Sequence, residues 1–367
     1  MIKLIQPYIE YEEVEADLRR IFETKQFTKG PYVQTFIEAL SDYTKARYVH
    51  LTSSATTALS TCLTLLNIQK GDEVIVSDFS FPASANVIEN LGAIPIFVDV
   101  DLDTFNMNPK LLVSQITPRT KAVIFVDALG NPSNLLEIKN ICANKGIPLI
   151  EDGACSIGSS IQNEKIGNIA DLTCFSFHPR KLLTTGEGGA ILTNNETWNH
   201  QLNILLNHGA TIRDTGFDFI YSGFNYRLSD ISCLLGIHQL NKLDDIIQRR
   251  QSLHDLYEAN LTPLGFQAQK VNKDTTHNKQ SVVFKTPPSI DRDKLINYLF
   301  VNHIEATMGT YSLSNTSFYT KKYQQQQINS AYLQKHTITL PCHDDVPAEK
   351  VIEKIVSFHK KTSTDLK

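Results

Sequence analysis

A lysine that could act as a nucleophile lies between an apolar run and a cluster of glycines. Lys181 follows residues 172–177, which we expect to form a buried strand, and it precedes the 186–189 segment Gly-Glu-Gly-Gly. Glycine lets a backbone approach a bound group closely, and a lysine amine that loses its hydration can become neutral and form a Schiff base with a carbonyl compound. A loop lysine is otherwise a solvated surface charge. The hypothesis therefore depends on other groups converging on Lys181.

A carboxylate could meet the same ligand. Asp152 follows an apolar run at residues 147–150, and ligands of open α/β sheets bind at the carboxyl ends of the strands. A carboxylate in that place would keep the pyridine nitrogen of pyridoxal 5′-phosphate (PLP) protonated, which makes the ring an electron sink. The alternative is that Asp152 caps the turn after the strand.

A run of hydroxyl and small residues offers a site for an anion. The 52–59 segment, Thr-Ser-Ser-Ala-Thr-Thr-Ala-Leu, follows an expected strand and opens an expected helix. Free backbone N–H groups, hydroxyls and the positive end of the helix dipole favour phosphate there. Serine and threonine also cap helices that bind nothing, so phosphate binding and simple capping both remain open.

The elements that position these residues alternate along the chain. Runs that are apolar throughout, such as Val74-Ile75-Val76, indicate strands buried on both faces of a mostly parallel sheet. Between them, helical patterns at 55–69, 83–91 and 133–145 end close to glycines. The alternation predicts an α/β doubly wound domain, and no Gly-x-Gly-x-x-Gly motif supports a nicotinamide site. The expected strands are residues 48–51, 73–77, 94–100, 122–126, 148–151, 172–177 and 190–193.

The length of 367 residues predicts one large and one smaller domain. The large domain is expected at residues 1–249 and starts with a helical segment. A long helical region at about 229–260 leads into a small α+β domain at residues 250–367. Its expected elements are a strand at 280–285, a helix at 291–302, a strand at 336–340 and a helix at 347–359.

Composition excludes several classes of protein. A net charge of −4 without a basic cluster argues against nucleic acid as a partner. The start of the chain lacks the pattern of a signal peptide, and no stretch approaches the ~20 apolar residues of a membrane helix. We therefore expect a cytoplasmic protein without a membrane partner. The six cysteines form no C-x-x-C pair, so we expect reduced thiols and neither a metal site nor a disulfide framework.

Several motifs follow one another in a specific order. They are Ser53-Ser54-Ala55-Thr56, Gly71-Asp72-Glu73-Val74-Ile75-Val76, Phe81, Glu151-Asp152, Ser176-Phe177-His178-Pro179-Arg180-Lys181 with Gly-Glu-Gly-Gly, and Asn225-Tyr226-Arg227. This order resembles the DegT/StrS family of sugar aminotransferases through about residues 25–250, and more weakly in the C-terminal third. The resemblance implies a fold-type-I PLP transferase. Such a protein has a large domain with a mostly parallel central sheet flanked by helices, and a smaller C-terminal α+β domain.

The resemblance implies four residues around the ring of the cofactor. Lys181 matches the catalytic lysine that holds PLP as a Schiff base, and Asp152 matches the carboxylate paired with the pyridine nitrogen. Phe81 matches the aromatic residue that stacks on the ring, with core packing as its alternative role. Cys155 stands where relatives often have glutamine or histidine in contact with the ring hydroxyl. Because a thiol is a poorer hydrogen-bond partner, that contact could be absent, mediated by water or supplied by another group.

The resemblance also implies four residues on the cofactor phosphate. Ala55, Thr56 and Ser176 match the phosphate cradle, and Ala55 stands where the family usually has glycine. Asn225 matches an asparagine that reaches the phosphate from the partner subunit. This implies an obligate homodimer with two shared active sites.

The implied activity is a ping-pong transamination in which Lys181 acts as general acid and base. Glutamate is the implied amino donor, and the implied acceptor is a keto-deoxysugar on a nucleoside diphosphate, as used for lipopolysaccharide and other polysaccharides. A sugar dehydratase of the same family would carry histidine in place of the lysine and is disfavoured. A PLP-binding regulator without turnover and a nucleotide-binding α/β module without PLP remain alternatives.

Overall fold

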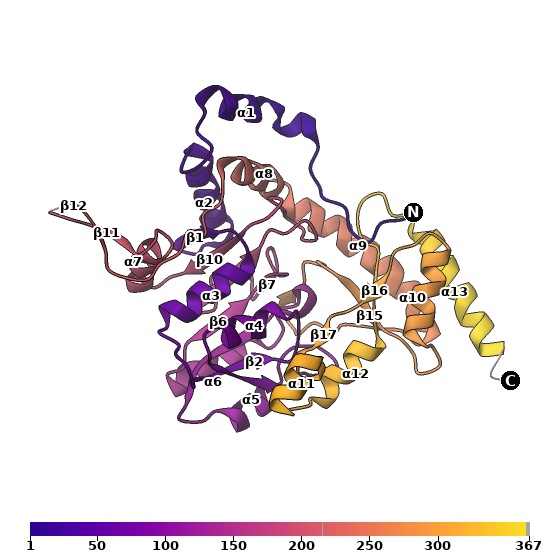
Figure 1. Cartoon of the computed structure of the whole chain (residues 1–367). Coiled ribbons are helices and arrows are strands. Elements are labelled where there is room, and N and C mark those ends of the chain that lie inside the picture. Colours follow the sequence, from indigo (N-terminus) through magenta and orange to yellow (C-terminus); the bar gives the residue numbers. More distant parts are fainter. Residues whose placement is uncertain (215, 365–367) are drawn as a thin grey trace.

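The computed structural model describes residues 1–214 and 216–364, and within them the largest sheet has seven strands (Figure 1). The strand order is β1-β10-β9-β6-β5-β2-β4, and within this sheet only β10 runs opposite to its neighbours. The predicted mostly parallel sheet is therefore confirmed. Its strands are β1 (Tyr48–Thr52), β2 (Glu73–Ser77), β4 (Ile94–Val98), β5 (Thr120–Val126), β6 (Leu149–Asp152), β9 (Leu172–Ser176) and β10 (Gly189–Thr193).

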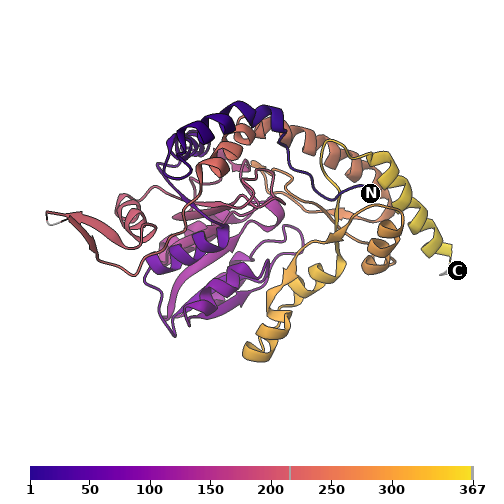
Figure 2. The same ribbon diagram turned by 45° about the horizontal axis from the view of Figure 1, so that its top comes forward.

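Apolar side chains bury both faces of this sheet. Val74 and Val76 pack in one core cluster with Leu59 of α3, whereas Ile75 packs in another with Phe36 of α2. Successive side chains of a strand point to opposite faces, so burial of both faces explains the uninterrupted apolar run. In Figure 2, α3 and α4 lie side by side on one face. The helices around the sheet are α2 (Pro31–Thr44), α3 (Ala55–Leu65), α4 (Ala83–Asn90), α5 (Pro109–Gln115), α6 (Leu135–Lys145) and α7 (Glu196–Leu205).

Glycine predicted the end of one of these helices correctly and the end of another incorrectly. The helix α6 ends at Lys145, and Gly146 adopts a left-handed conformation with φ 65°, as predicted. The helix α3 ends at Leu65, earlier than the predicted residue 69. The reason is that Asn67 already adopts the left-handed conformation, with φ 54°, and asparagine is one of the few residues besides glycine that tolerate it. The predicted end of this helix was therefore wrong.

The expected long helical region at 229–260 is a pair of helices. They are α8 (Asp230–Leu240) and α9 (Leu243–Leu261), and α9 passes through the expected domain boundary at 249/250 without a break. The helix α8 lies against α2 and against α1 (Tyr11–Thr24). At Gly236 a Cβ atom would lie 2.5 Å from the Phe36 ring, so glycine allows α8 and α2 to pack closely.

All six cysteines are free, five are buried, and Cys155 is partly exposed. Among the helices of the described residues, none combines the length and the apolar character that a bilayer span requires.

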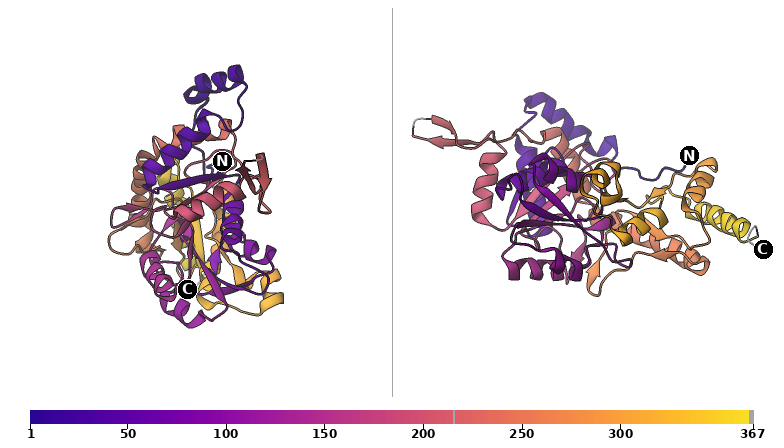
Figure 3. Two further views of the ribbon diagram at one scale, coloured as in Figure 1. Left: turned by 90° about the vertical axis from the view of Figure 1, so that its left-hand side faces the viewer. Right: turned by 60° about the horizontal axis from the view of Figure 1, so that its bottom comes forward.

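A two-stranded hairpin projects away from the body of the molecule (Figures 1 and 3). It consists of β11 (Ala210–Arg213) and β12 (Gly216–Phe219), paired antiparallel. Apolar side chains on the hairpin are exposed, with Ile212 at 78% and Phe217 at 74%. Contiguous exposed apolar side chains often mark a surface that binds another molecule.

The C-terminal part forms a second core around another sheet. In the described part of the chain this sheet has four strands in the order β13-β15-β18-β16. Phe284 and Ile338 of the sheet pack with Leu295 of α10 and Ile355 of α13. The elements are β13 (Gln267–Ala268), β15 (Val282–Lys285), α10 (Arg292–Val301), β16 (Thr307–Met308), β18 (Thr337–Leu340) and α13 (Ala348–Thr364).

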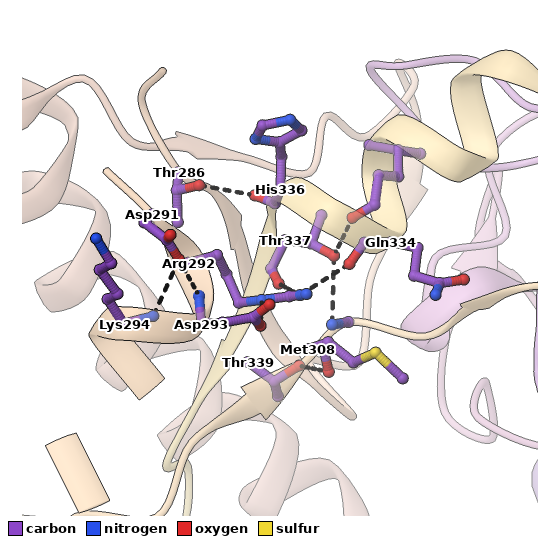
Figure 4. Close-up of polar contacts among 12 residues, drawn as sticks. Thr286, Asp291, Arg292, Asp293, Lys294, Met308, Gln334, His336, Thr337 and Thr339 are labelled. Carbon is purple, nitrogen blue, oxygen red and sulfur yellow. Dashed lines mark hydrogen bonds and ion pairs between the residues drawn. The ribbon is translucent and has the colours of Figure 1, made fainter. Parts of the chain in front are cut away.

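Polar contacts fix the start of α10 to this sheet (Figure 4). Asp291 Oδ1 accepts from the backbone N of Asp293 and of Lys294, each at 3.0 Å, and caps the helix. Arg292 Nη1 donates to Gln334 O at 2.8 Å and to Thr337 O at 2.7 Å. These bonds tie α10 to the end of α12 (Ile328–His336) and the start of β18.

Two smaller sheets link the C-terminal part to the large sheet region. β17 (Tyr311–Ser312) pairs with β3 (Phe79–Ser80), and β14 (Thr275–Thr276) joins β7 (Ser160–Ile161) and β8 (Glu164–Lys165). The helix α11 (Ser317–Tyr323) follows β17. The pairing of β17 with β3 therefore brings two segments that are far apart in the sequence together beside Phe81.

Candidate active site

Lys181 lies in the loop that follows β9 and lines a cavity of about 210 Å³. Its Nζ is 3.0 Å from Cys155 Sγ, and its backbone N donates to His178 O at 2.8 Å. Four of the eight residues that we expect at the cofactor line this cavity, namely Phe81, Asp152, Cys155 and Lys181. The structure therefore brings the expected ring-binding residues together.

Asp152 stands at the carboxyl end of β6 with its side chain fixed by two donors. Ser84 Oγ donates to Asp152 Oδ2 at 2.6 Å, and Ala154 N donates to Asp152 Oδ1 at 3.2 Å. Burial raises the pKa of Asp152, while these hydrogen bonds and the charge of Lys181 act in the opposite direction. The carboxyl group is thus held in one orientation as a partner for a cationic group in the cavity.

Two further carboxyl groups lie close to Asp152. Glu151 Oε2 accepts from Thr173 Oγ1 at 2.6 Å, and Asp127 Oδ2 accepts from Ser156 Oγ. Burial raises the pKa of Glu151 to about 7, and burial followed by repulsion from Glu151 raises the pKa of Asp127. Raised pKa values favour the neutral forms, so the pair adds less negative charge beside Asp152 than two carboxyl groups with ordinary pKa values would.

Ala55 and Ser176 come from distant segments but lie against the same glycine. Gly189 is the sheet partner of Ser176, and a Cβ atom on Gly189 would lie 2.7 Å from Ala55 N. Any other residue would push the two segments apart. Ala55 and Ser176 thus share one neighbourhood, although they do not line the 210 Å³ cavity.

The first turn of α3 offers backbone donors. Ser54 Oγ accepts from Thr57 N at 3.1 Å, so the helix is capped as the simpler hypothesis predicts. The N–H groups of Ala55 and Thr56 have no acceptor within the helix, because the first amides of a helix precede its hydrogen-bond ladder. Capping and anion binding are therefore compatible here, since the two use different N–H groups.

Phe81 and Asn225 are both exposed. Phe81 is 65% exposed, and its ring centre lies 6.2 Å from that of Tyr311 in an edge arrangement. This exposure does not support core packing as the role of Phe81. Asn225 does not line the cavity of its own subunit, so its expected role needs a second subunit and stays a prediction.

Other residues at the site were not anticipated from the sequence. Ser84 of α4 orients Asp152, and the available signal was its spacing of four from Ser80 at the end of β3. The hydroxyl oxygens of Ser80 and Ser84 are 2.8 Å apart. Leu4 and Ile5 of the N-terminal segment and Gln280 also line the cavity. Nothing in the local pattern around these three residues indicated a role at the site.

The donor groups match PLP in type. A lysine amine can bind an aldehyde, a buried carboxylate can pair with a pyridinium, and helix amides beside a serine hydroxyl can hold a phosphate. The close approach at Gly189, which a Cβ atom would prevent, keeps the expected phosphate donors together. The fold and these residues define a PLP-dependent enzyme of fold type I.

The chain belongs to the DegT/DnrJ/EryC1/StrS aminotransferase family, whose model matches residues 8–358. It is thus a PLP-dependent aminotransferase. The chain is similar to GDP-perosamine synthase of Escherichia coli O157:H7, with 33% identity over 362 residues that cover 98% of each chain. It is also 30% identical, over 354 residues, to UDP-4-amino-4,6-dideoxy-N-acetyl-beta-L-altrosamine transaminase of Campylobacter jejuni subsp. jejuni serotype O:23/36 (strain 81-176), covering 94% of this chain and 93% of the other.

A solved structure shares the fold throughout. It is the PLP form of the putative sugar aminotransferase Spr1654 from Streptococcus pneumoniae, with a TM-score of 0.91 and 26% identity. The similarity covers 100% of this chain and 99% of the other. The predicted fold-type-I architecture is thereby confirmed over the whole length of the chain.

Proposed function

We propose that the protein transfers an amino group from glutamate to a keto-deoxysugar linked to a nucleoside diphosphate, in the synthesis of a polysaccharide or lipopolysaccharide. The observation that carries this proposal is the placement of the Lys181 amine and the buried Asp152 carboxyl group in one cavity. The names of two relatives, which refer to a GDP-linked and a UDP-linked amino sugar, support the substrate class.

Different residues of this chain have different roles in the proposed reaction. Lys181 Nζ would hold the cofactor until the amino group of the donor displaces it. The freed amine would then remove a proton from the carbon that bears this amino group and later return one to the sugar carbon. Asp152 holds the proton on the pyridine nitrogen, and the first amides of α3 with Ser176 hold the phosphate. Bound PLP supplies an electron sink for the negative charge left at the deprotonated carbon. The amino group replaces the oxo oxygen of the sugar and glutamate becomes 2-oxoglutarate, so no further reactant is consumed.

The substrate class can be tested with the reverse half-reaction. We expect at least one GDP- or UDP-linked amino-deoxysugar to change the visible absorbance of the bound cofactor and to yield the keto-sugar by mass spectrometry. The same sugars without the nucleotide are the matched control and should react poorly. If glutamate reacts but no nucleotide-linked sugar does, the substrate class is wrong. If glutamate does not react either, the chain is a PLP-binding regulator instead.

We also propose that the active site is shared between two copies of the chain. The projecting hairpin exposes Ile212, Phe217 and Phe219 and extends away from the body of the molecule. Along the chain it leads directly to Asn225, which is exposed and lies outside the cavity of its own subunit. A second copy would cover the apolar hairpin and receive Asn225 as a donor to its cofactor phosphate. The loss of this hydrogen bond should cost roughly 1.5–3 kcal/mol of cofactor affinity.

Mixing two inactive variants tests the shared site. Lys181→Ala and Asn225→Asp subunits, once exchanged, should form heterodimers in which one site is intact and the other carries both defects. Activity should return to about half that of the same number of wild-type dimers, because each heterodimer has a single intact site.

The matched control for this mixing experiment is Lys181→Ala with Asp152→Asn. These residues line the same cavity, so neither site of the heterodimer is intact and no activity should return. Exchange is verified by mass in both mixtures. If Asn225→Asp is impaired and exchanges, yet restores nothing, Asn225 acts within its own subunit.

A further inference from the structure

Gln280 holds both peptide groups that flank Lys181. Its Nε2 donates to Arg180 O at 2.8 Å, and its Oε1 accepts from Leu182 N at 2.8 Å. The first of these groups belongs to the peptide bond before Lys181 and the second to the peptide bond after it. One side-chain amide thus spans the lysine, and at 4% exposure it does so away from solvent.

Gln280 is itself fixed from two directions. Its backbone N donates to Asn278 Oδ1 at 2.9 Å, and its carbonyl accepts from Arg250 Nη2 at 2.9 Å. Arg250 is 3% exposed on α9 and also donates through Nε to Lys279 O at 2.8 Å. Arg250 therefore anchors to α9 the segment that leads into β15, and the Gln280 side chain extends from this anchored segment to the Lys181 loop.

The same segment holds the other wall of the cavity. Asn278 Nδ2 donates to Cys155 O and to Ile157 O, each at 2.8 Å. Cys155 Sγ is the atom 3.0 Å from the Lys181 Nζ. Two neighbouring amide side chains, Asn278 and Gln280, thus fix the Cys155 turn and the Lys181 loop relative to each other.

We infer that Gln280 is a positioning residue that sets the place of the Lys181 amine. The inference rests on the role of Lys181 in the proposed function. A proton-transfer group must stand within a fraction of an ångström of its working place, and a misplacement of about 1 Å can cost 100-fold in rate. A glutamine amide suits this task, because it donates to one peptide group and accepts from the next. A carboxylate accepts only, and an aliphatic side chain does neither.

The chain offers a matched control on the same loop. Gln239 of α8 is also fully buried, and its amide brackets Thr184, accepting from Thr184 N at 3.1 Å and donating to Thr184 O. Gln239 therefore stabilises the loop by the same kind of bond, three residues beyond Lys181. A purely structural effect should be equal in variants of Gln239 and Gln280.

The test compares Gln280→Leu, the isosteric Gln280→Glu and the control Gln239→Leu. In the protein freed of cofactor, an amine-selective reagent is followed by peptide mass spectrometry, with exposed Lys121 as internal reference. Labelling of Lys181 relative to Lys121 should be about threefold faster or more in both Gln280 variants, since loss of one hydrogen bond weakens the loop by that order. It should stay near the wild-type value in Gln239→Leu. In the holoenzyme, kcat should fall about 10- to 100-fold in the Gln280 variants with KM for glutamate within about twofold.

Equal labelling and equal kcat in wild type and in both Gln280 variants would overturn the inference, as would the same change in Gln239→Leu. Gln280→Glu conserves the shape of the side chain. If Gln280→Leu does not fold, the labelling and the kcat of Gln280→Glu alone test the inference. The labelling does not depend on catalysis. If wild-type protein fails to react with glutamate while the labelling result holds, the proposed function is wrong and the positioning of Lys181 by Gln280 stands.

Discussion

Replacing Lys181 with alanine is expected to lower the rate of amino transfer by about 10⁴-fold or more. The variant loses the amine that we propose both holds the cofactor and moves the proton. Initial rates with glutamate give the size of the loss. In the wild type, borohydride reduction should attach the mass of the cofactor to the peptide that contains Lys181.

The matched control is Lys121→Ala, because Lys121 is exposed on β5 and does not line the cavity. It should keep wild-type rates and the same borohydride-labelled peptide. Attachment of the cofactor to a peptide with another lysine, in place of the Lys181 peptide, would contradict the assignment of Lys181.

The second large effect is expected from Asp152→Asn. The amide keeps the shape of the side chain and can still accept from Ser84 Oγ, so the variant should retain bound cofactor. It no longer offers the negative charge that we propose holds a proton on the pyridine nitrogen. An opposite charge within about 4–6 Å shifts a pKa by about 1–3 units, so turnover should fall by about 10- to 1,000-fold.

Ser84→Ala provides a graded comparison. It removes one hydrogen bond to Asp152 Oδ2 but leaves the charge, so the loss in rate should be about 10-fold or less. Cofactor content is measured by absorbance and by mass in each variant. Near-normal turnover of Asp152→Asn with full cofactor content would show that Asp152 does not act on the ring.

The local patterns of the sequence were sufficient for most of the elements. The run Val74-Ile75-Val76 predicted a strand buried on both faces, and it forms β2 between β5 and β4 of the seven-stranded sheet. Gly146 marked the end of α6, while Asn67, not Gly71, ended the helical geometry of α3. These features are local, because hydrophobic period and left-handed conformations depend on neighbouring residues.

The sequence by itself indicated the family, through the order of several motifs along the chain. It also indicated the mostly parallel sheet and the candidates Lys181 and Asp152, because these rest on residue types in short segments. Only the tertiary structure decided how they are held. Ser84 reaches Asp152 across 68 residues, and Gln280 reaches both sides of Lys181 across about a hundred. Such contacts carry no periodic signal, since they arise when helices and strands from separate parts of the chain pack together and leave a buried polar group that must find a partner.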